Sequence, residues 1–265
     1  MTIIQAIILG LIQGLTEFIP VSSSGHLLLA HNLMGIQDNG LIFDVALHLG
    51  TLTALTVVFC KDIYSLVMSI FKKSKQTKLA WLLILATLPA VVARVLLQSL
   101  AETKFRSVIL ASIAMIIMAF IMITSEKYSS KLSKRTKIDD VNINQALAMG
   151  FAQAVALIPG VSRSGVTITT GLFAGIDRVA ATRFTFLLAI PITLGAILKI
   201  FVSNGTINQI SSQPDIFIIG IITAFVSGIF AIKFMLSYLA KHTLNIFAYY
   251  RIIVATVSLI AIALW

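Results

Sequence analysis

The chain has 265 residues, of which 58% are hydrophobic and 11% are charged, and its mean hydropathy is +1.00. This composition excludes an ordinary soluble domain and a disordered chain, and it predicts an all-α polytopic membrane protein. The net charge of +10 does not indicate a nucleic-acid partner, because the Lys and Arg residues lie in short loops between apolar runs. We expect these basic loops to contact the anionic headgroups of membrane lipids.

The first apolar stretch, residues 2–34, is interrupted near its middle by the sequence IPVSSSG. Pro and Gly end helices and Ser residues cap them, so this stretch predicts a broken helix hairpin that re-enters the membrane. A second stretch, 144–176, is interrupted in the same way by IPGVSRSG. Six further apolar runs are long enough to span a membrane, which takes about 20 residues. These predicted transmembrane spans are 41–60, 79–99, 106–125, 180–202, 215–237 and 246–264.

Two loops, 61–78 and 126–140, each carry five Lys or Arg residues, whereas 31–40 and 203–214 carry none. Positively charged loops collect on the cytoplasmic side of a membrane, so we expect the two basic loops to be cytoplasmic. Two predicted spans separate them, which is consistent with this assignment. Both termini and both ends of the first hairpin should then face away from the cytoplasm.

The two interrupted stretches match one another at an offset of 140 residues. Each is followed by three predicted spans, and an odd number of spans turns the second copy upside down relative to the first. Such an inverted-topology repeat places discontinuous helices and a ligand site near the membrane midplane. We therefore predict one membrane domain, 1–265, built from repeat 1 (1–125), a basic cytoplasmic linker (126–143) and repeat 2 (144–265). The matching pairs are Gln5 and Gln145, Ala6 and Ala146, Gly10 and Gly150, Gln13 and Gln153, Val21 and Val161, Ser22 and Ser162, Ser24 and Ser164, and Gly25 and Gly165.

Glu17 is the one acidic residue that lies deep inside an apolar stretch, since the other nine fall in loops or near the ends of spans. An ionisable group there is costly unless it is paired or faces water, so Glu17 is a candidate functional residue. The alternative is a carboxylate that is paired with a buried Arg to fix helix packing. Gln13 lies one helical turn earlier on the same face, where it can orient Glu17, bind a ligand oxygen or join two helices.

In each copy, the serines that follow the break can cap a new helix, which leaves backbone N–H groups free at the helix start. Two such helix starts, one from each side of the membrane, would favour an anion between them, and phosphate above all. Arg163 lies between two serines of the second copy, and its planar fork of five donors suits a phosphate group. The candidate caps are Ser22, Ser23 and Ser24 in the first copy and Ser162 and Ser164 in the second.

His26 lies within one helical turn of Ser22 and Ser23, where an acid or base that titrates near neutral pH would be useful. His48 lies in a predicted span and is either a link between helices or a residue that supports the site. No His and carboxylate pair has the spacing of a zinc site, and the single Cys60 excludes a disulfide and a cysteine-based zinc site.

Two long sequence motifs carry a resemblance to the undecaprenyl-diphosphate phosphatases, the bacitracin-resistance family of integral membrane enzymes. The first motif stands here as QGLTE, from Gln13 to Glu17, and continues into FIPVSSSGH. The second stands as PGVSRS, from Pro159 to Ser164, and continues to Thr167. Further matching stretches are FDVALHLGT (43–51), FTFLLAIP (184–191) and ITAFVSGIFAIK (222–233), so the resemblance covers essentially the whole chain.

The resemblance implies that the chain removes the terminal phosphate of undecaprenyl diphosphate at the bacterial cytoplasmic (inner) membrane. The product is the monophosphate carrier that peptidoglycan and other envelope polymers reuse. The resemblance also implies a divalent cation, Mg²⁺ or Ca²⁺, with Glu17 as a ligand. Many members carry a first Glu where this chain has Gln13, which weakens a site with two carboxylates and shifts acid and base work onto Glu17 and His26. The expected partners are the isoprenoid diphosphate lipid, membrane lipids and a second copy of the chain in a homodimer.

We expect the site to open on the extracytoplasmic side, with Glu17, Ser23, His26 and Arg163 as the catalytic residues. The nucleophile is either Ser23, activated by His26 or Glu17, or a water activated by Glu17. The residues expected to bind the substrate are Gln13, Ser22, Ser162, Ser164 and Thr167. Two other classes of function are the alternatives. One is a transporter or flippase, because inverted repeats with broken helices are common in transporters. The other is a structural membrane protein, which the many buried polar groups disfavour.

Overall fold

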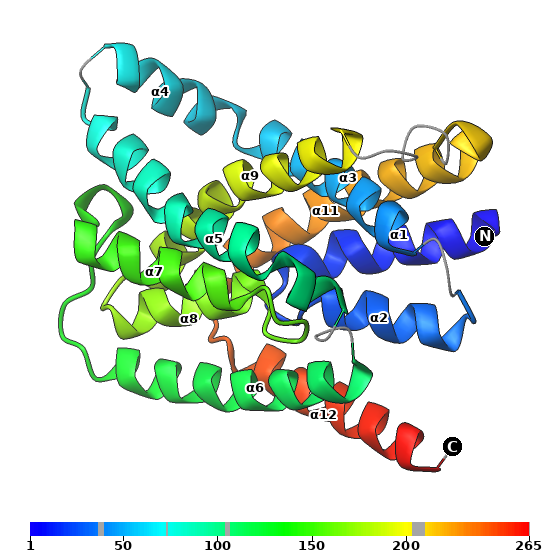
Figure 1. The fold of residues 1–265 in the computed structure, drawn as a ribbon. Helices are drawn as coiled ribbons and strands as arrows, with labels where there is room; N and C mark the ends of the chain where they lie inside the picture. Colours follow the sequence, from blue (N-terminus) through cyan, green and yellow to red (C-terminus); the bar gives the residue numbers. More distant parts are fainter. Residues whose placement is uncertain (37–39, 73, 104–106, 203–209, 265) are drawn as a thin grey trace.

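The computed structural model describes all residues except 37–39, 73, 104–106, 203–209 and 265. The described part of the chain is helical, apart from its connecting turns and one isolated β-bridge between Thr136 and Ile176 (Figure 1). The helices are α1 (Ile3–Phe18), α2 (Ser23–Leu33), α3 (Gly40–Val58), α4 (Cys60–Phe71), α5 (Thr77–Thr103), α6 (Val108–Ser130), the short η1 (Ile138–Asp140), α7 (Ile143–Val155), α8 (Arg163–Phe173), α9 (Arg178–Val202), α11 (Pro214–Leu239) and α12 (Asn245–Leu264).

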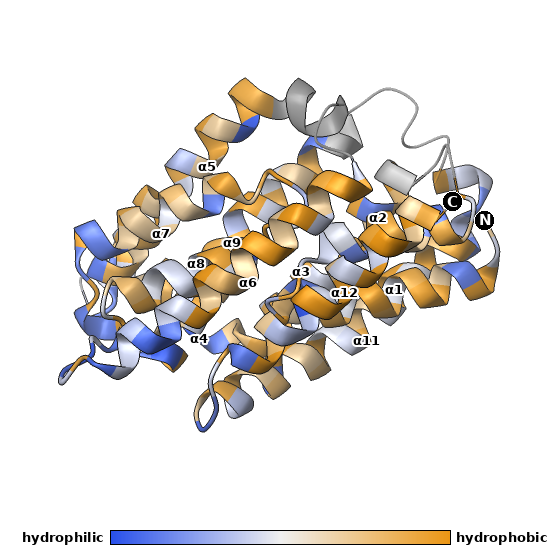
Figure 2. Ribbon diagram, turned by 90° about the horizontal axis from the view of Figure 1, so that it is seen from below, coloured by the Kyte–Doolittle hydropathy of each residue, from blue (hydrophilic) through white to orange (hydrophobic). Residues whose placement is uncertain are grey.

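The predicted all-α, multi-pass membrane fold is confirmed. In the described residues, α5, α6, α9, α11 and α12 are each long and apolar enough to cross a membrane. The helices α3 and α4 together pass the same test, although they are bent by 78°. Figure 2 shows hydrophobic residues along the helices and hydrophilic residues gathered towards the connecting loops. The six predicted spans therefore correspond to α3, α5, α6, α9, α11 and α12.

One prediction about the loops was wrong, because residues 60–71 form the helix α4 rather than part of a basic loop. Four apolar residues recur at helical spacing on one face of α4, and Leu66 is buried there. On another part of α4, the carboxylate of Asp62 accepts a hydrogen bond from Arg183 of α9 at 2.7 Å. The segment was predicted as a loop from its number of basic residues, and its amphipathic pattern was not considered. The four apolar residues are Ile63, Leu66, Val67 and Ile70.

Two broken helix hairpins, α1–α2 and α7–α8, occupy the centre of the fold. Both begin with a capping box, in which the side chains of Thr2 and Gln5, or of Asn142 and Gln145, exchange hydrogen bonds with each other's backbone. Figure 1 shows the two hairpins entering from opposite ends of the molecule, so that their turns meet near the middle. An inverted repeat requires these features, and for the chain as a whole it stays a prediction.

Small residues let each first half-helix approach a long helix of the other predicted repeat. Helix α1 packs against α11, and α7 packs against α5. A Cβ atom added to Gly10 would lie 2.7 Å from the carbonyl oxygen of Gly220, and one added to Gly150 would overlap the backbone of Ala86. Helices approach this closely only where side chains are absent, as is common between helices in membranes.

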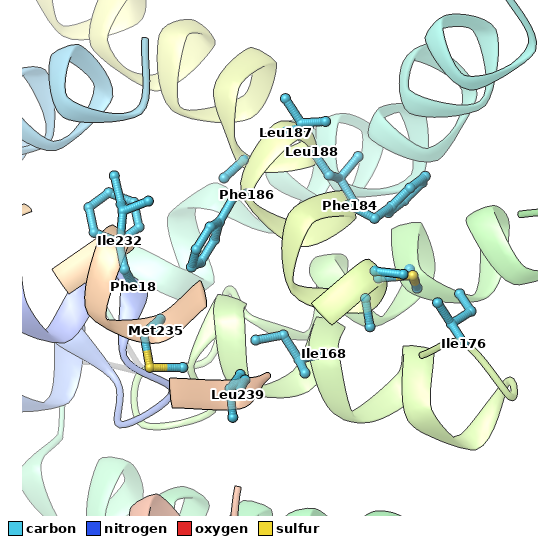
Figure 3. Close-up of a cluster of buried hydrophobic side chains, with 14 of the residues drawn as sticks. Phe18, Ile168, Ile176, Phe184, Phe186, Leu187, Leu188, Ile232, Met235 and Leu239 are labelled. Atoms are coloured by element: carbon cyan, nitrogen blue, oxygen red, sulfur yellow. The ribbon is translucent and has the colours of Figure 1, made fainter. Parts of the chain in front are cut away.

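A buried cluster of aromatic and aliphatic side chains fixes the end of α1 (Figure 3). Phe18 is 2% exposed, and its ring meets the ring of Phe186 from α9 edge to face, with 5.5 Å between the centroids. Aromatic pairs of this geometry are favourable beyond the area that they bury. Because Phe18 follows Glu17 directly, the packing of Phe18 positions the carboxylate.

Candidate active site

The first break has the backbone geometry that the sequence predicted. Ile19 is extended (ψ 133°), as a residue before Pro prefers, and α1 ends there. Ser22 then caps α2, and its hydroxyl accepts a hydrogen bond from the backbone N–H of Gly25 at 3.3 Å. The prediction of a serine cap is confirmed, and the cap is Ser22.

The second break repeats this geometry. Ser162 caps α8, and its hydroxyl accepts a hydrogen bond from the N–H of Gly165 at 3.1 Å. Ser22 and Ser162 have φ angles of 77° and 72°, and in the described part of the chain they are the two non-glycine residues with positive φ. This conformation costs about 1–3 kcal/mol per residue and is concentrated at functional sites. The strain therefore marks both turns at matching positions.

Arg251 of α12 holds both turns in place. It is fully buried, and it donates to the carbonyl oxygen of Pro20 at 3.1 Å and to that of Gly160 at 2.6 Å. Two longer bonds, each 3.2 Å, reach the carbonyl oxygens of Met115 and Val161. Carbonyl groups at the end of a broken helix lack partners within the helix, so one buried guanidinium satisfies both breaks at once. Arg251 is thus a structural residue of the site.

Three side chains from the two hairpins meet at Glu17, whose side chain is 9% exposed. Arg163 donates to Glu17 Oε1 with 2.6 Å between Nη2 and the oxygen. Ser23 Oγ donates to Glu17 Oε2 at 2.6 Å, and Gln13 Nε2 donates to the same oxygen at 3.0 Å. The structure therefore brings together the predicted acid, the predicted nucleophile and the predicted phosphate-binding Arg.

His48 of α3 joins this cluster through Gln13. Gln13 Nε2 lies 2.9 Å from His48 Nδ1, and His48 Nδ1 lies 3.7 Å from Glu17 Oε2. Because Nε2 of Gln13 carries two hydrogens, it can donate to both Glu17 and His48, and His48 Nδ1 is then an acceptor. Gln13 thus orients the carboxylate of Glu17. Gln13 was predicted to bind the substrate, but its side chain is completely buried behind Glu17.

A cavity of about 220 Å³ opens beside Glu17. One water molecule occupies about 30 Å³ in the liquid, so the cavity can hold several water molecules or a small anionic group. Two guanidinium groups and one carboxylate line it, which favours a ligand of negative charge. The helix starts at Ser23 and Arg163 add their own attraction for anions. The lining residues are Glu17, Ser23, Ser24, Val45, His48, Ala90, Arg94, Gln153, Ala156, Leu157, Ser162, Arg163, Ile192, Thr193 and Ala196.

The structure does not bring His26 to Ser23 or Glu17. His26 Nδ1 lies 2.8 Å from the carbonyl oxygen of Ser22, so it is the donor, and His26 Nε2 then accepts from the hydroxyl of Tyr250 at 2.9 Å. The two rings are also stacked, with 5.6 Å between their centroids. With both nitrogens engaged in this way, His26 is not the base for Ser23 in this arrangement. The helical spacing correctly predicted that His26 lies one turn after Ser22. However, His26 contacts the backbone carbonyl group of Ser22 and not a side-chain hydroxyl.

Four of the five predicted substrate-binding residues lie outside the cavity lining. Gln13 lies behind Glu17, and the other three lie in or beside the two turns. The hydroxyl of Thr167 is completely buried and donates to the carbonyl oxygen of Arg163 at 2.7 Å, within its own helix. Ser164 Oγ lies 3.3 Å from Ser162 Oγ, and Ser22 caps α2. These residues shape the turns. Ser162 is the predicted serine of the second turn that lines the cavity.

The donor set fits a divalent cation in one way only. In the described part of the chain, no group of three His, Cys, Asp or Glu side chains is arranged to hold a metal ion. Glu17 is the carboxylate of the cavity, and both of its oxygens already face hydrogen-bond donors. Mg²⁺ is usually held by one or two carboxylates together with phosphate oxygens of the substrate. The site therefore fits a cation that arrives with a phosphate ligand.

Several lining residues were not among the predicted site residues. Gln153 could have been found as the repeat partner of Gln13, and Arg94 as a polar group within a span. His48 was predicted only as a link between helices or a supporting residue. Thr193 gave no signal, because a lone Thr in a span most often bonds to its own helix. In the structure it accepts a hydrogen bond from Arg163 Nη1.

The sequence profile of a family described as bacitracin resistance protein BacA matches residues 6–257 of the chain. The undecaprenyl-diphosphatase of Moorella thermoacetica is 42% identical over 267 residues, which cover 100% of this chain and 99% of that protein. The undecaprenyl-diphosphatase of Caldicellulosiruptor bescii is 43% identical over 98% of this chain and 97% of its own length. That of Thermodesulfovibrio yellowstonii is 42% identical over 96% and 95%.

Proposed function

The chain belongs to the bacitracin resistance protein family, and on this premise we propose that it is an integral membrane phosphatase. It hydrolyses undecaprenyl diphosphate to undecaprenyl phosphate and inorganic phosphate, recycles the lipid carrier for cell-wall synthesis and thereby confers resistance to bacitracin. The observation that carries the proposal is the meeting of Glu17, Ser23 and Arg163 at one cavity between two helix starts. A long isoprenoid can stay in the bilayer while its diphosphate enters this cavity.

Arg163 is the main ligand of the terminal phosphate. Thr193 and Glu17 hold its guanidinium at the cavity wall, so its geometry is set before the substrate arrives. Ser162 and the free N–H groups at the starts of α2 and α8 supply further donors. Preorganised donors of this kind stabilise the charge that develops during phosphoryl transfer.

Ser23 is the proposed nucleophile, because its hydroxyl already donates to Glu17 at 2.6 Å. Glu17 takes the hydroxyl proton and passes it to solvent while Ser23 Oγ bonds to the terminal phosphorus. The bond from that phosphorus to the bridging oxygen breaks, and the lipid leaves as its monophosphate. A water then attacks the phosphoserine, gives a proton to Glu17 and releases phosphate, and Ser23 recovers its proton from Glu17.

The alternative route has Glu17 activate a water that attacks the terminal phosphorus directly. Rapid acid quench during turnover, followed by mass spectrometry, distinguishes the two routes. A phosphoserine at Ser23 supports the serine route, whereas near-full turnover by Ser23→Ala excludes it.

We also propose that a divalent cation, Mg²⁺ or Ca²⁺, assists the reaction. Glu17 would hold it together with oxygens of the diphosphate, as the donor set allows. When bound, such a cation neutralises phosphate charge. His26, Ser22, Ser164 and Thr167 then contribute by fixing the turns that present Ser23 and Arg163, and Gln13 by orienting Glu17.

The proposed orientation places both termini and the opening of the site on the extracytoplasmic side. Figure 1 shows the start of α5 and the connection at 131–142 at one end of the molecule and both termini at the other. These segments belong to the basic loops, so their end is assigned to the cytoplasm. Arg94 lines the cavity 17 residues after Thr77, which is about 25 Å along α5 at 1.5 Å per residue. The cavity lies beside the two turns, near the middle of the molecule, and we propose that it opens from there towards the terminal side.

The oligomeric state belongs to the same proposal. Four large apolar residues form an exposed stripe along α12, and each is more than half exposed. Lipid chains or a second copy of the chain can cover such a stripe in a membrane. We propose a homodimer through this face, and mass measurement of the purified protein in detergent tests it. The residues of the stripe are Ile246, Ile253, Val257 and Ile260.

Phosphate release from undecaprenyl diphosphate by the purified protein tests the function. Wild type should release inorganic phosphate, and Glu17→Ala and Arg163→Ala should be inactive. A flippase is the second candidate, because opposed broken hairpins are also a transporter architecture. Lipid movement without phosphate release, or full hydrolysis by Glu17→Ala, would contradict the phosphatase assignment.

A further inference from the structure

Gln153 of α7 is a buried amide on the wall of the cavity. The residue is 4% exposed, and in the described part of the chain neither its Nε2 nor its Oε1 has a hydrogen-bond partner. An amide that is removed from water without a partner is costly, so such groups are normally paired in folded proteins. A polar side chain held unpaired against a polar cavity is available to a ligand.

The repeat explains why this amide is unpaired. Gln13, its match in the first copy, gives its Nε2 hydrogens to Glu17 and His48. In the second copy, Leu157 stands one turn after Gln153, where Glu17 stands after Gln13. Leu157 also lines the cavity. The amide thus orients a carboxylate in the first hairpin, whereas in the second it is unpaired and belongs to a residue of the cavity wall.

The position of Gln153 selects which phosphate it meets. The terminal phosphate must lie against Ser23, because Ser23 Oγ attacks it, and Ser23 belongs to the first hairpin. Gln153 lies on α7, which packs against α5, the helix that carries Arg94. Gln153 and Arg94 line the cavity from α7 and α5, whereas Ser23 lines it from the first hairpin. The second phosphate of a diphosphate needs hydrogen-bond donors of its own, and Gln153 and Arg94 can supply them.

We propose that Gln153 is a substrate-binding residue whose Nε2 donates to the phosphate that remains on the lipid. This proposal rests on the proposed phosphatase function. Gln153 would hold the leaving lipid monophosphate equally in the substrate and in the product, so it contributes to affinity for both. Its Oε1 can accept a hydrogen bond from a hydrating water or from a protonated phosphate oxygen.

The test replaces the amide with an apolar side chain of similar length, Gln153→Met. A hydrogen bond to a charged group contributes about 1.5–3 kcal/mol, so KM for undecaprenyl diphosphate should rise about 10- to 100-fold with little change in kcat. The inhibition constant of undecaprenyl phosphate should rise by a similar factor, and that of inorganic phosphate should stay unchanged. Thermal unfolding of the ligand-free protein should occur at the same or a higher temperature, because an unpaired buried amide is removed.

Gln13→Met is the matched variant. It removes the repeat-equivalent amide but breaks bonds to Glu17 and His48, so kcat should fall and the unfolding temperature should drop. Thr87→Val is the control, because the Thr87 hydroxyl is buried and donates only to the carbonyl oxygen of Leu83. KM should be unchanged there.

Two results would overturn the role of Gln153: an unchanged KM, or a lower unfolding temperature of Gln153→Met with a fall in kcat alone. If wild type releases no phosphate, the phosphatase function fails separately. Direct binding of undecaprenyl diphosphate to the protein in nanodiscs then still tests Gln153. Equal affinities of wild type and Gln153→Met in that measurement would contradict the proposal.

Discussion

Arg163 Nη2 lies 2.6 Å from Glu17 Oε1, so the cation of the second hairpin is paired with the carboxylate of the first. Each residue lies beside the break in its own hairpin: Glu17 lies three residues before Pro20, and Arg163 directly follows Ser162. Neither hairpin contains both partners. The site therefore exists only where the two turns meet, and the packing of both hairpins controls its geometry.

The fork of the Arg163 guanidinium should be required in addition to its charge. One nitrogen donates to Glu17 and another to Thr193, and the ammonium group of Lys cannot reproduce a planar fork. We expect Arg163→Lys to fold but to lose at least about 100-fold in kcat/KM, a loss typical of a misplaced charge-stabilising donor. Phosphate release measures this.

Arg183→Lys is the control for that variant. The Arg183 pair with Asp62 is much more exposed, at 40% and 32% of the two side chains, and exposed pairs contribute little. Its kcat/KM should stay within about twofold of wild type on that basis. Near-normal activity of Arg163→Lys would mean that charge alone suffices.

His26 and Tyr250 should act as one unit that supports the turn at Ser22. The ring of His26 links the Ser22 carbonyl oxygen to the Tyr250 hydroxyl. His26→Asn and Tyr250→Phe should each lower kcat by about tenfold or less, and the double variant should be no worse than the more damaging single one. Loss of a general base would instead lower kcat by about 100- to 10,000-fold. Such a loss in His26→Asn alone, with a changed pH profile, would restore His26 as the base.

The sequence was sufficient for features that depend on neighbours along the chain. The serine caps, the breaks at Pro20 and Pro159 and the choice of Glu17 as a candidate residue follow from local propensity and from the cost of a charge in an apolar stretch. Both hairpins and the six spans were predicted for the same reason. The proposed role of Arg163 followed from its place between Ser162, which caps α8, and Ser164.

Contacts between distant segments could not be read in this way. His48 and Thr193 approach Glu17 and Arg163 only because α3 and α9 pack beside the hairpins. Arg251 lies 231 residues after Pro20, and its carbonyl partners become visible only when both turns are placed. For His26 the sequence correctly predicted the neighbouring residue, Ser22, but it could not show that the contact is with the carbonyl oxygen of Ser22.

Arg251→Met should lower stability more than it lowers substrate affinity. The variant leaves buried carbonyl groups at both turns unsatisfied, including those of Pro20 and Gly160. Each buried carbonyl group that loses its donor costs about 1–3 kcal/mol, so the unfolding temperature in detergent should fall markedly. An unchanged unfolding temperature with weaker substrate binding would instead place Arg251 against the ligand.

Removal of divalent cations should abolish activity and leave the fold unchanged. Within the described residues, no cluster of three metal-binding side chains exists to stabilise the protein by itself, and Glu17 is already satisfied by Arg163 and Ser23. A cation that binds with the substrate diphosphate adds nothing to the stability of the free protein. A chelator should therefore stop phosphate release, Mg²⁺ or Ca²⁺ should restore it, and the unfolding temperature of the substrate-free protein should stay constant throughout. A fall in that temperature on chelation would indicate a structural metal site, and full activity in the chelator would contradict a cation requirement.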